Sequence, residues 1–107
     1  MIPSARRILD LLRSRPIRYL PKDAVIDDKG GHAFLYVTGG RWEWSWTILQ
    51  ETKTADYRKR LSELRDLGYT ILSFHAPYNL EGGRTITRHG YILIAEPKEK
   101  ELQSIPL

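Results

Sequence analysis

The sequence has no cysteine, no long apolar run and only a small excess of charge, and each lack excludes a class of protein. Without cysteine, neither a disulfide scaffold nor a thiolate metal site can form. No apolar run approaches the roughly 20 residues that a membrane-spanning helix needs. Residues 1–12 mix Arg6, Arg7 and Asp10 with apolar residues, so they lack the apolar region of a secretion signal. We therefore expect a cytoplasmic protein with no membrane partner.

The residues that are present suffice for one globular domain. The 107 residues include three Trp and six Tyr, which supply core area. We expect a single domain over residues 1–97 and a polar tail over residues 98–107. Lys and Arg number 17 against 13 Asp and Glu. Residues 1–22 hold six of the basic residues and one acid, Asp10, which suits a polyanionic partner.

Two segments have the apolar spacing of amphipathic helices. Ser4 can cap a first helix that continues to Arg15, because Pro16 ends it. The clearest helix is predicted over residues 54–67, with Gly68 as its stop residue. Its apolar residues fall on one side at helical spacing: Tyr57, Leu61, Leu64 and Leu67.

Residues 32–49 admit two interpretations. His32 to Val37 has the composition of a strand, and Gly39-Gly40 that of a turn. Beyond the turn, three tryptophans alternate with polar residues: Trp42, Trp44 and Trp46. This alternation is typical of a strand, whereas Ser45 is a suitable cap for a short helix. We favour a strand that ends at Trp44 and then a short helix. Core or interface packing explains the tryptophans best, with a base-stacking surface as the alternative.

The C-terminal part predicts a β-hairpin. Tyr69 to Phe74 and Arg84 to Ala95 have strand composition, and Ala76 to Gly83 between them has that of a loop. The faces of the second strand alternate, with Tyr91, Leu93 and Ala95 on one and Ile92 and Ile94 on the other. In this hairpin His75 and His89 face each other.

The order of helix, strand, short helix, long helix and hairpin matches an α+β winged helix-turn-helix. This fold has three helices plus a C-terminal β-hairpin wing, and here an extra strand or hairpin is inserted after the first helix. In such a fold the second helix of the pair enters the major groove, and the hairpin lies against the backbone or minor groove. We therefore predict double-stranded DNA binding, with helix 54–67 as the recognition helix and hairpin 69–95 as the wing.

Two stretches carry a resemblance to a known family. Arg60 to Ile71 reads RLSELRDLGYTI, and Gly83 to Leu93 reads GRTITRHGYIL. They resemble the recognition helix and wing of small phage-type winged helix-turn-helix DNA-binding domains, and Trp46 to Gln50 and Ser4 to Arg15 resemble the helices before them. The resemblance implies a transcriptional, phage or mobile-element regulatory role. The sequence departs from the family in its long segment over residues 17–41.

The residues expected to contact DNA are the polar groups of the long helix, the wing and the basic N-terminal segment. Arg and Lys donate to guanine or phosphate, and Ser and Thr contact either. The candidates are Lys53, Thr54, Asp56, Arg58, Lys59 and Ser62 by the helix, Arg84, Thr85 and Arg88 in the wing, and Arg6 and Arg7 near the N-terminus. A single module of this size buries little DNA surface, which favours a homodimer.

No motif in the sequence indicates catalysis, a metal or a cofactor. His32, His75 and His89 lack the spacing of a zinc site, and a turn explains Asp27-Asp28 before Gly30-Gly31. No nucleotide-binding loop or nucleophile motif is present. We therefore expect no enzyme and no small-molecule substrate. Two other functions stay open: a small αβ protein that binds a protein partner, and a toxin-type ribonuclease that uses His, Arg and Tyr on a sheet.

Overall fold

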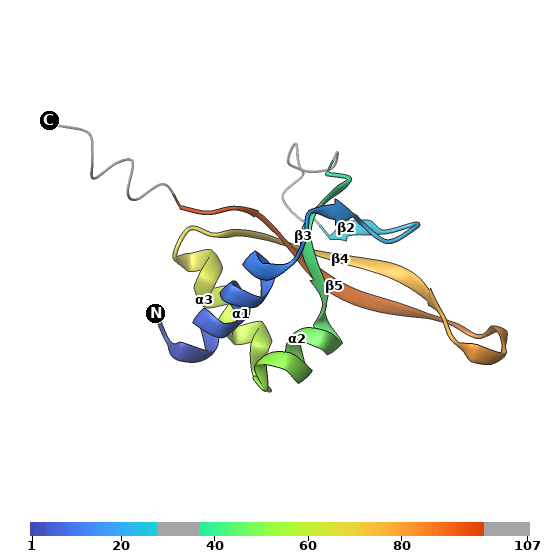
Figure 1. The fold of residues 1–107 in the computed structure, drawn as a ribbon, viewed down its shortest axis with the longest axis horizontal. Coiled ribbons are helices and arrows are strands. Elements are labelled where there is room, and N and C mark those ends of the chain that lie inside the picture. The colour runs from blue at the N-terminus through green and yellow to red at the C-terminus, as the bar shows by residue number, and fades with distance from the viewer. Residues whose placement is uncertain (28–36, 98–107) are drawn as a thin grey trace, which may run out of the picture.

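The computed structural model describes residues 1–27 and 37–97, and these residues form an α+β fold. In chain order the elements are α1 (Pro3–Ser14), β1 (Arg18–Tyr19), β2 (Val25–Asp27), β3 (Gly39–Trp44), α2 (Ser45–Thr52), α3 (Tyr57–Asp66), β4 (Thr70–Asn79), a 3-10 turn (Glu81–Gly83) and β5 (Thr85–Ala95). The helices lie below one face of the sheet, and the β4–β5 hairpin projects beyond them (Figure 1).

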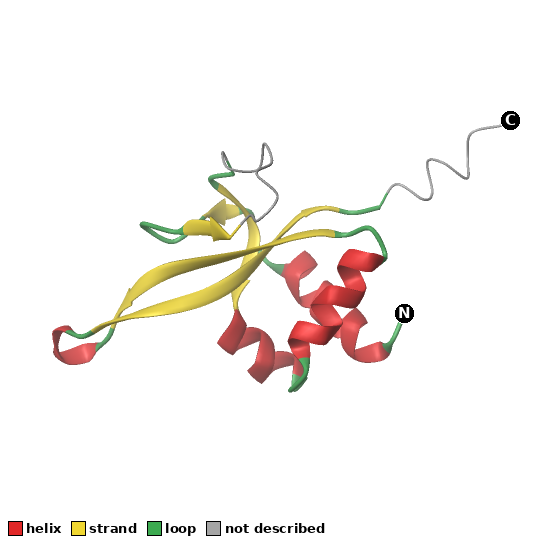
Figure 2. Cartoon of the chain, turned by 180° about the vertical axis from the view of Figure 1, so that it is seen from behind, coloured by secondary structure: helices red, strands yellow, loops and turns green. Residues whose placement is uncertain are grey.

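The five strands make one antiparallel sheet with the order β1-β3-β5-β4-β2. At its centre β4 pairs with β5 from Thr70 opposite Ala95 to Asn79 opposite Thr85. Figure 2 shows this long twisted hairpin running from the helices to the turn at its tip. β3 joins the outer side of β5, and β2 joins the outer side of β4. The flanking strands therefore cover only the inner half of the hairpin.

Strand alternation gives the sheet two cores. Successive side chains of a strand point to opposite faces, so each strand contributes to both. On the helical face the buried residues are Ala5, Ile8, Leu9, Leu12, Ile48, Leu61, Leu64, Ile71, Tyr91 and Leu93. On the other face the buried residues are Trp42, Phe74 and Ile92. The prediction that Tyr91 and Leu93 face one side of the sheet and Ile92 the other is confirmed.

The second core is covered by the connection between the two edge strands. β1 and β2 lie at opposite edges of the sheet, so the short segment that joins them must cross its face. Leu20, Ala24 and Ile26 from this region pack against Trp42 and Phe74. The helices occupy the opposite face, so the hairpin is packed on both sides.

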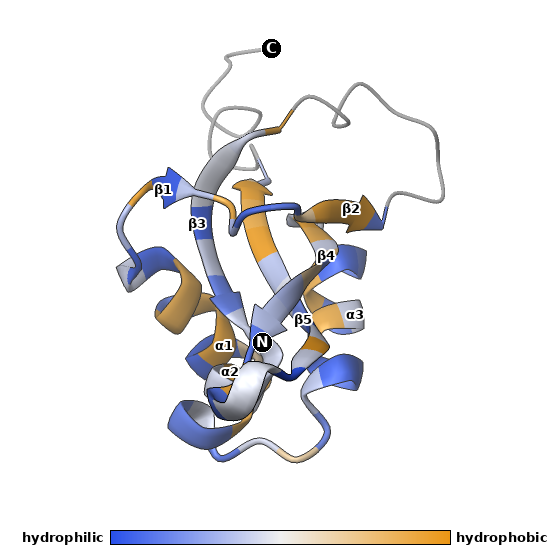
Figure 3. Ribbon diagram, turned by 90° about the vertical axis from the view of Figure 1, so that its right-hand side faces the viewer, coloured by the Kyte–Doolittle hydropathy of each residue, from blue (hydrophilic) through white to orange (hydrophobic). Residues whose placement is uncertain are grey.

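The helical layer is held together by α1 and α3. Pro3 begins α1, because a proline at the first helical position has no N–H to satisfy. Leu61 and Leu64 of α3 are fully buried, and α1 and α3 pack directly on each other. From the hairpin tip, α3 lies on the β4 and β2 side, and α1 and α2 lie on the β3 side (Figure 3). α3 therefore lies beside the inner half of the hairpin, close to Ile71, Leu72 and Ser73.

The predicted winged helix-turn-helix class is wrong. The hairpin is not a wing at the C-terminal margin of three helices, but the centre of a five-stranded sheet ordered β1-β3-β5-β4-β2. The prediction failed because β1 and β2 have only two and three residues, too few to show a periodicity in sequence. Such strands form by pairing with strands that are distant in the chain.

Several predicted elements are correct in type but differ in their bounds. The strand that ends at Trp44 and the short helix after it are confirmed, but Gly39-Gly40 begins β3 and is not a turn. The helix predicted over residues 54–67 spans only Tyr57–Asp66, and Leu67 is exposed. β4 continues to Asn79, through the predicted loop. The strand expected from His32, apart from Val37, and the tail over residues 98–107 lie outside the described residues.

The inner hairpin depends on a close contact between Phe74 and Gly90, which face each other across the two strands. A Cβ atom on Gly90 would lie 2.4 Å from Phe74 Cζ and 2.9 Å from the Glu43 carbonyl oxygen. We expect Gly90→Ala to lower the free energy of unfolding by about 1–3 kcal/mol, because overpacking forces buried groups apart. Urea denaturation measures the change. Thr87→Ala, exposed on the same strand, is the control and should change stability by less than about 0.5 kcal/mol. Equal stability of the two variants would contradict the proposed contact.

Candidate nucleic-acid interface

A groove of about 740 Å³ lies between α3 and the sheet. It takes residues from β2, α3, β4 and β5, which are far apart in sequence. Its lining residues are Asp27, Arg58, Arg65, Ile71, Leu72, Ser73, His89 and Tyr91. Two guanidinium groups against one carboxylate give the groove a cationic character.

The two sides of α3 differ in environment because helical periodicity separates them. Leu61 and Leu64 are buried against the core, whereas Arg58, Lys59 and Ser62 are exposed. These exposed residues were all predicted as DNA contacts. The exposed side therefore carries two cations and one hydroxyl group beside the groove.

Arg65 is fixed at the inner end of the groove. Its Nε donates to the Ile71 carbonyl oxygen at 2.8 Å, and its second terminal nitrogen donates to Ser73 Oγ at 3.1 Å. Its guanidinium carbon lies 6.0 Å from the centre of the Tyr91 ring. These contacts hold a charge in a defined place while the residue stays exposed. Arg65 is not among the DNA contacts predicted from the sequence, since its β4 partners are set by tertiary packing.

Arg58 lies at the outer end of the same groove. Its guanidinium carbon is 5.8 Å from the centre of the Tyr57 ring. A hydrogen bond with Tyr57 raises the pKa of Arg58, and arginine is protonated at physiological pH in any case. Tyr91 lies in the floor, and burial raises the pKa of its phenol. The phenol therefore remains neutral beside the two cations.

The acidic groups at the start and middle of α3 are bound by a buried arginine. Arg60 is only 9% exposed, and it makes ion pairs of 2.9 Å with both Asp56 and Glu63. The hydrogen bond from Arg60 lowers the pKa of Asp56. The single charge of Arg60 thus offsets part of the negative charge of Asp56 and Glu63. Because both carboxylates are paired with Arg60, they do not pair with the exposed cations of the helix.

Two imidazoles and a carboxylate lie on the sheet beside the groove. His75 and His89 are register partners, as predicted, with ring centres 6.1 Å apart. Asp27 Oδ1 lies 2.7 Å from His75 Nδ1. The sequence explained Asp27 by a turn, but it is the last residue of β2 and pairs with Ser73. The signal that was missed is the pairing of β2 with β4, which sequence patterns do not reveal.

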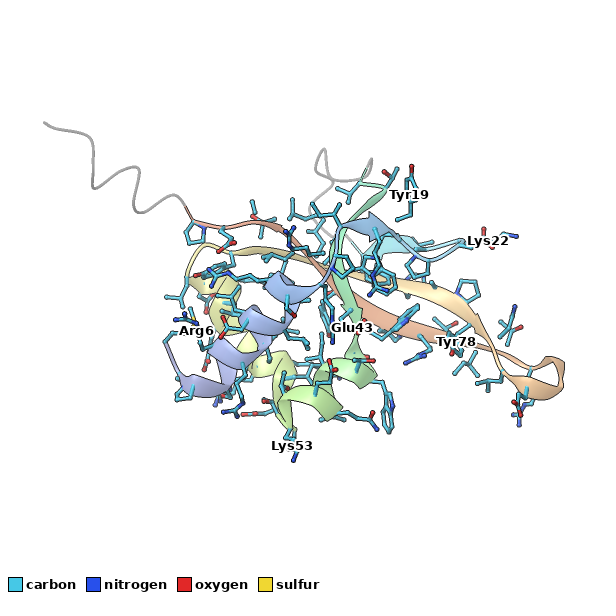
Figure 4. All side chains as sticks on the ribbon, viewed as in Figure 1. Arg6, Tyr19, Lys22, Glu43, Lys53 and Tyr78 are labelled. Carbon is cyan, nitrogen blue, oxygen red and sulfur yellow. The ribbon has the colours of Figure 1, made fainter. Side chains whose placement is uncertain are left out.

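The other predicted helix contacts lie in different surroundings. Thr54 is only 4% exposed, and its hydroxyl donates to the Thr52 carbonyl oxygen at 3.1 Å. It precedes α3 and does not present its side chain to solvent. Asp56 is bound to Arg60, as described. Lys53 is exposed at the α2–α3 turn, with φ of 52° in the left-handed region (Figure 4).

The predicted wing contacts divide between two faces of the hairpin. Arg84 and Thr85 lie near its tip, and Thr85 Oγ1 donates to Asn79 Oδ1 at 3.0 Å. Arg88 lies on the face away from the groove, with its guanidinium carbon 4.8 Å from the Trp44 ring centre and 4.5 Å from that of Tyr78. The alternation of β5 was the signal for this placement, since Arg88 shares a face with Ile92.

Arg6 and Arg7 lie on the exposed side of α1. Arg6 Nε pairs with Asp10 Oδ1 at 3.2 Å, and Arg7 donates to the Thr52 carbonyl oxygen at 3.3 Å. Arg6 lies on the side of the helical layer away from the hairpin tip (Figure 4). Neither arginine is part of the groove, so the structure does not bring them together with Arg58 and Arg65.

The described residues, 1–27 and 37–97, hold neither a metal-ligand cluster nor a membrane-spanning helix. Within these ranges no group of three or more His, Asp or Glu residues is arranged to hold a metal ion. No described helix has the length and apolar character needed to cross a membrane.

Comparison with known proteins gives no relative. No protein-family model matches the chain, and neither the curated proteins nor the solved structures include a significant match. The geometry of the groove is thus the basis for any functional assignment.

The Arg60–Asp56 pair can be tested by titration. Because Arg60 lowers the pKa of Asp56, the folded carboxyl should titrate below the range of an ordinary aspartate. The pair then stabilises the protein above the unfolded-state pKa, and this contribution is lost as the pH falls through the folded-state pKa. Carboxyl-carbon NMR measures the midpoint. Arg60→Met should raise it, and an unchanged midpoint would refute the role assigned to Arg60.

Proposed function

We propose that this chain binds double-stranded DNA, with the exposed side of α3 against the major groove and the hairpin along the adjacent backbone. The observation that carries the proposal is the exposed, cationic side of α3 beside a projecting hairpin. Arg58, Lys59 and Ser62 are solvent-exposed, and the nearby carboxylates of Asp56 and Glu63 are bound by Arg60. These properties suit a surface that meets phosphates.

The dimensions of α3 support this arrangement. A helix of ten residues is about 15 Å long, and a major groove about 12 Å wide admits one helix. In this arrangement Ser62 reaches toward base edges, and Arg58, Lys59 and Arg65 bind the flanking phosphates. Arg84 at the hairpin tip reaches a further phosphate. The helix assigned to recognition is thus Tyr57–Asp66, not the longer segment expected from sequence.

Arg6, Arg7 and Lys53 contribute to the proposal only through long-range charge. They lie outside the groove, and they add affinity that does not depend on DNA sequence and falls with salt. A DNA-binding protein of this kind acts in the cytoplasm as a regulator of transcription or of a mobile element. That role is part of the proposal, and it follows from DNA binding alone.

Fluorescence anisotropy with a labelled duplex tests the proposal at several salt concentrations. Lys59→Gln should weaken binding and reduce the slope of log affinity against log salt by about 0.9, the value for one lost phosphate contact. Lys22→Gln is the matched control, since Lys22 is also exposed but lies across the sheet from the helices (Figure 4). It should leave affinity nearly unchanged. Absence of duplex binding by the wild type at low salt would end the proposal.

A second candidate function is cleavage of RNA, and the Asp27–His75–His89 cluster favours it. Two imidazoles 6.1 Å apart can flank one phosphodiester, and the carboxylate at 2.7 Å orients His75. The ribose 2′-oxygen attacks phosphorus, and the bond from phosphorus to the 5′-oxygen breaks. One imidazole takes the 2′-hydroxyl proton, and the other gives a proton to the leaving oxygen. Arg58 and Arg65 offset the charge that develops on phosphate.

This candidate predicts a 2′,3′-cyclic phosphate and a 5′-hydroxyl as the products of single-stranded RNA. His89→Ala should lower the cleavage rate by about 10²-fold or more, because general acid–base transfer contributes 10²–10⁴-fold. Arg84→Ala, at the hairpin tip, is the control and should leave the rate nearly unchanged. Mass spectrometry of the products checks both. A wild type that leaves RNA intact removes ribonuclease activity from consideration and does not affect the DNA proposal.

A further inference from the structure

The outer half of the hairpin extends past the strands that flank it. β3 pairs with β5 only from Gly90 to Leu93, and β2 pairs with β4 only from Ser73 to His75. Among the described strands, residues 76–79 of β4 and residues 85–89 of β5 therefore have no partner strand on their outer sides. Each outer edge presents main-chain donors and acceptors that can pair with another strand.

The two outer edges differ in their capacity to pair. The β4 edge contains Pro77, which has no N–H to donate and so blocks strand addition at that point. The β5 edge contains no proline, glycine or acidic residue over its five outer positions. These are Thr85, Ile86, Thr87, Arg88 and His89. Three of them are β-branched, which favours extended structure.

An exposed apolar surface lies beside the open β5 edge. A shallow groove of about 380 Å³ is lined by Trp46, Tyr78, Leu80, Ile86 and Arg88. Trp46 is 57% exposed, and Tyr78, Leu80 and Ile86 are each about 40% exposed. The guanidinium carbon of Arg88 lies 4.8 Å from the Trp44 ring centre and 4.5 Å from the Tyr78 ring centre. A contiguous apolar surface next to an open strand edge indicates a protein partner.

We propose that the occupant is a second copy of this chain, joined through antiparallel pairing of β5 with β5. A two-fold axis at Thr87 sets this residue opposite its own copy, Ile86 opposite Arg88 of the second copy, and Thr85 opposite His89 of the second copy. A Thr–Thr pair is favourable, and no like charges face each other directly. The chain thus supplies a complementary strand of its own, as a closed two-fold interface requires.

The pairing also brings the two apolar grooves side by side. Ile86 and Arg88 point to the face that bears Trp46 and Tyr78, so each copy brings its apolar groove to the same side of the joined sheet. Arg58 and Arg65 lie across the sheet from it, so a dimer leaves the α3 groove open. This inference stands independently of DNA binding.

A charge-exchange experiment tests the interface and its register. Analytical ultracentrifugation of the wild type should show a reversible dimer. Thr87→Lys and Thr87→Glu each place like charges opposite each other, and each should weaken self-association by about fivefold or more. An equimolar mixture of the two variants should restore the dimer, because opposite charges then meet at the same position. Thr87 is exposed, and circular dichroism and thermal unfolding confirm that both variants keep the fold.

Cross-linking gives a second measurement. The chain has no cysteine, so a single introduced thiol reports on one position. Under mild oxidation Thr87→Cys should form a covalent dimer, whereas Lys22→Cys, across the sheet from the helices, should not. A wild type that stays monomeric at high concentration overturns the proposal. The β5 edge would then be available to pair with a strand of a different protein. A dimer that Thr87→Lys and Thr87→Glu do not weaken also overturns it.

Discussion

The antiparallel pairing of β4 with β5 is the constraint on which the described structure depends. This hairpin occupies the centre of the sheet, and every other strand joins it directly or through β3. Its register decides which side chains face the helices and which face the β1–β2 connection. A slip of one residue would exchange the two faces, so the burial of Phe74 on one side and Tyr91 on the other fixes the register.

The same register determines the chemistry of the groove. Ser73, His89 and Tyr91 share the face toward α3 because they alternate with Phe74, Gly90 and Ile92, which lie on the opposite face. α3 contributes Arg58 and Arg65 from the opposite side of the groove. Neither element forms the site alone, because the helix supplies charge and the strands supply a floor and the hydrogen-bonding partners of Arg65.

The cationic surface of α3 depends on ion pairing within the helix as well as on the positions of its basic residues. Three acidic residues lie in or beside the helix, with Asp56 just before it, Glu63 in its second half and Asp66 at its end. Arg60 binds the first two from a nearly buried position. Counted over residues 56–66, the basic residues outnumber the acidic residues by only one. The cationic surface exists because the acids and their partner lie away from Arg58 and Arg65.

The sequence by itself determined the elements whose periodicity is local: the amphipathic helices, the alternating faces of β5, and the facing pair of His75 and His89. It also determined that α3 has an exposed polar side with Lys59 and Ser62. Tertiary structure alone decided the sheet order, the place of Asp27 beside His75, and the contacts of Arg65. The reason is physical, since a strand of two or three residues has no period to detect, and the groove and the Asp27–His75 pair form only when distant segments meet.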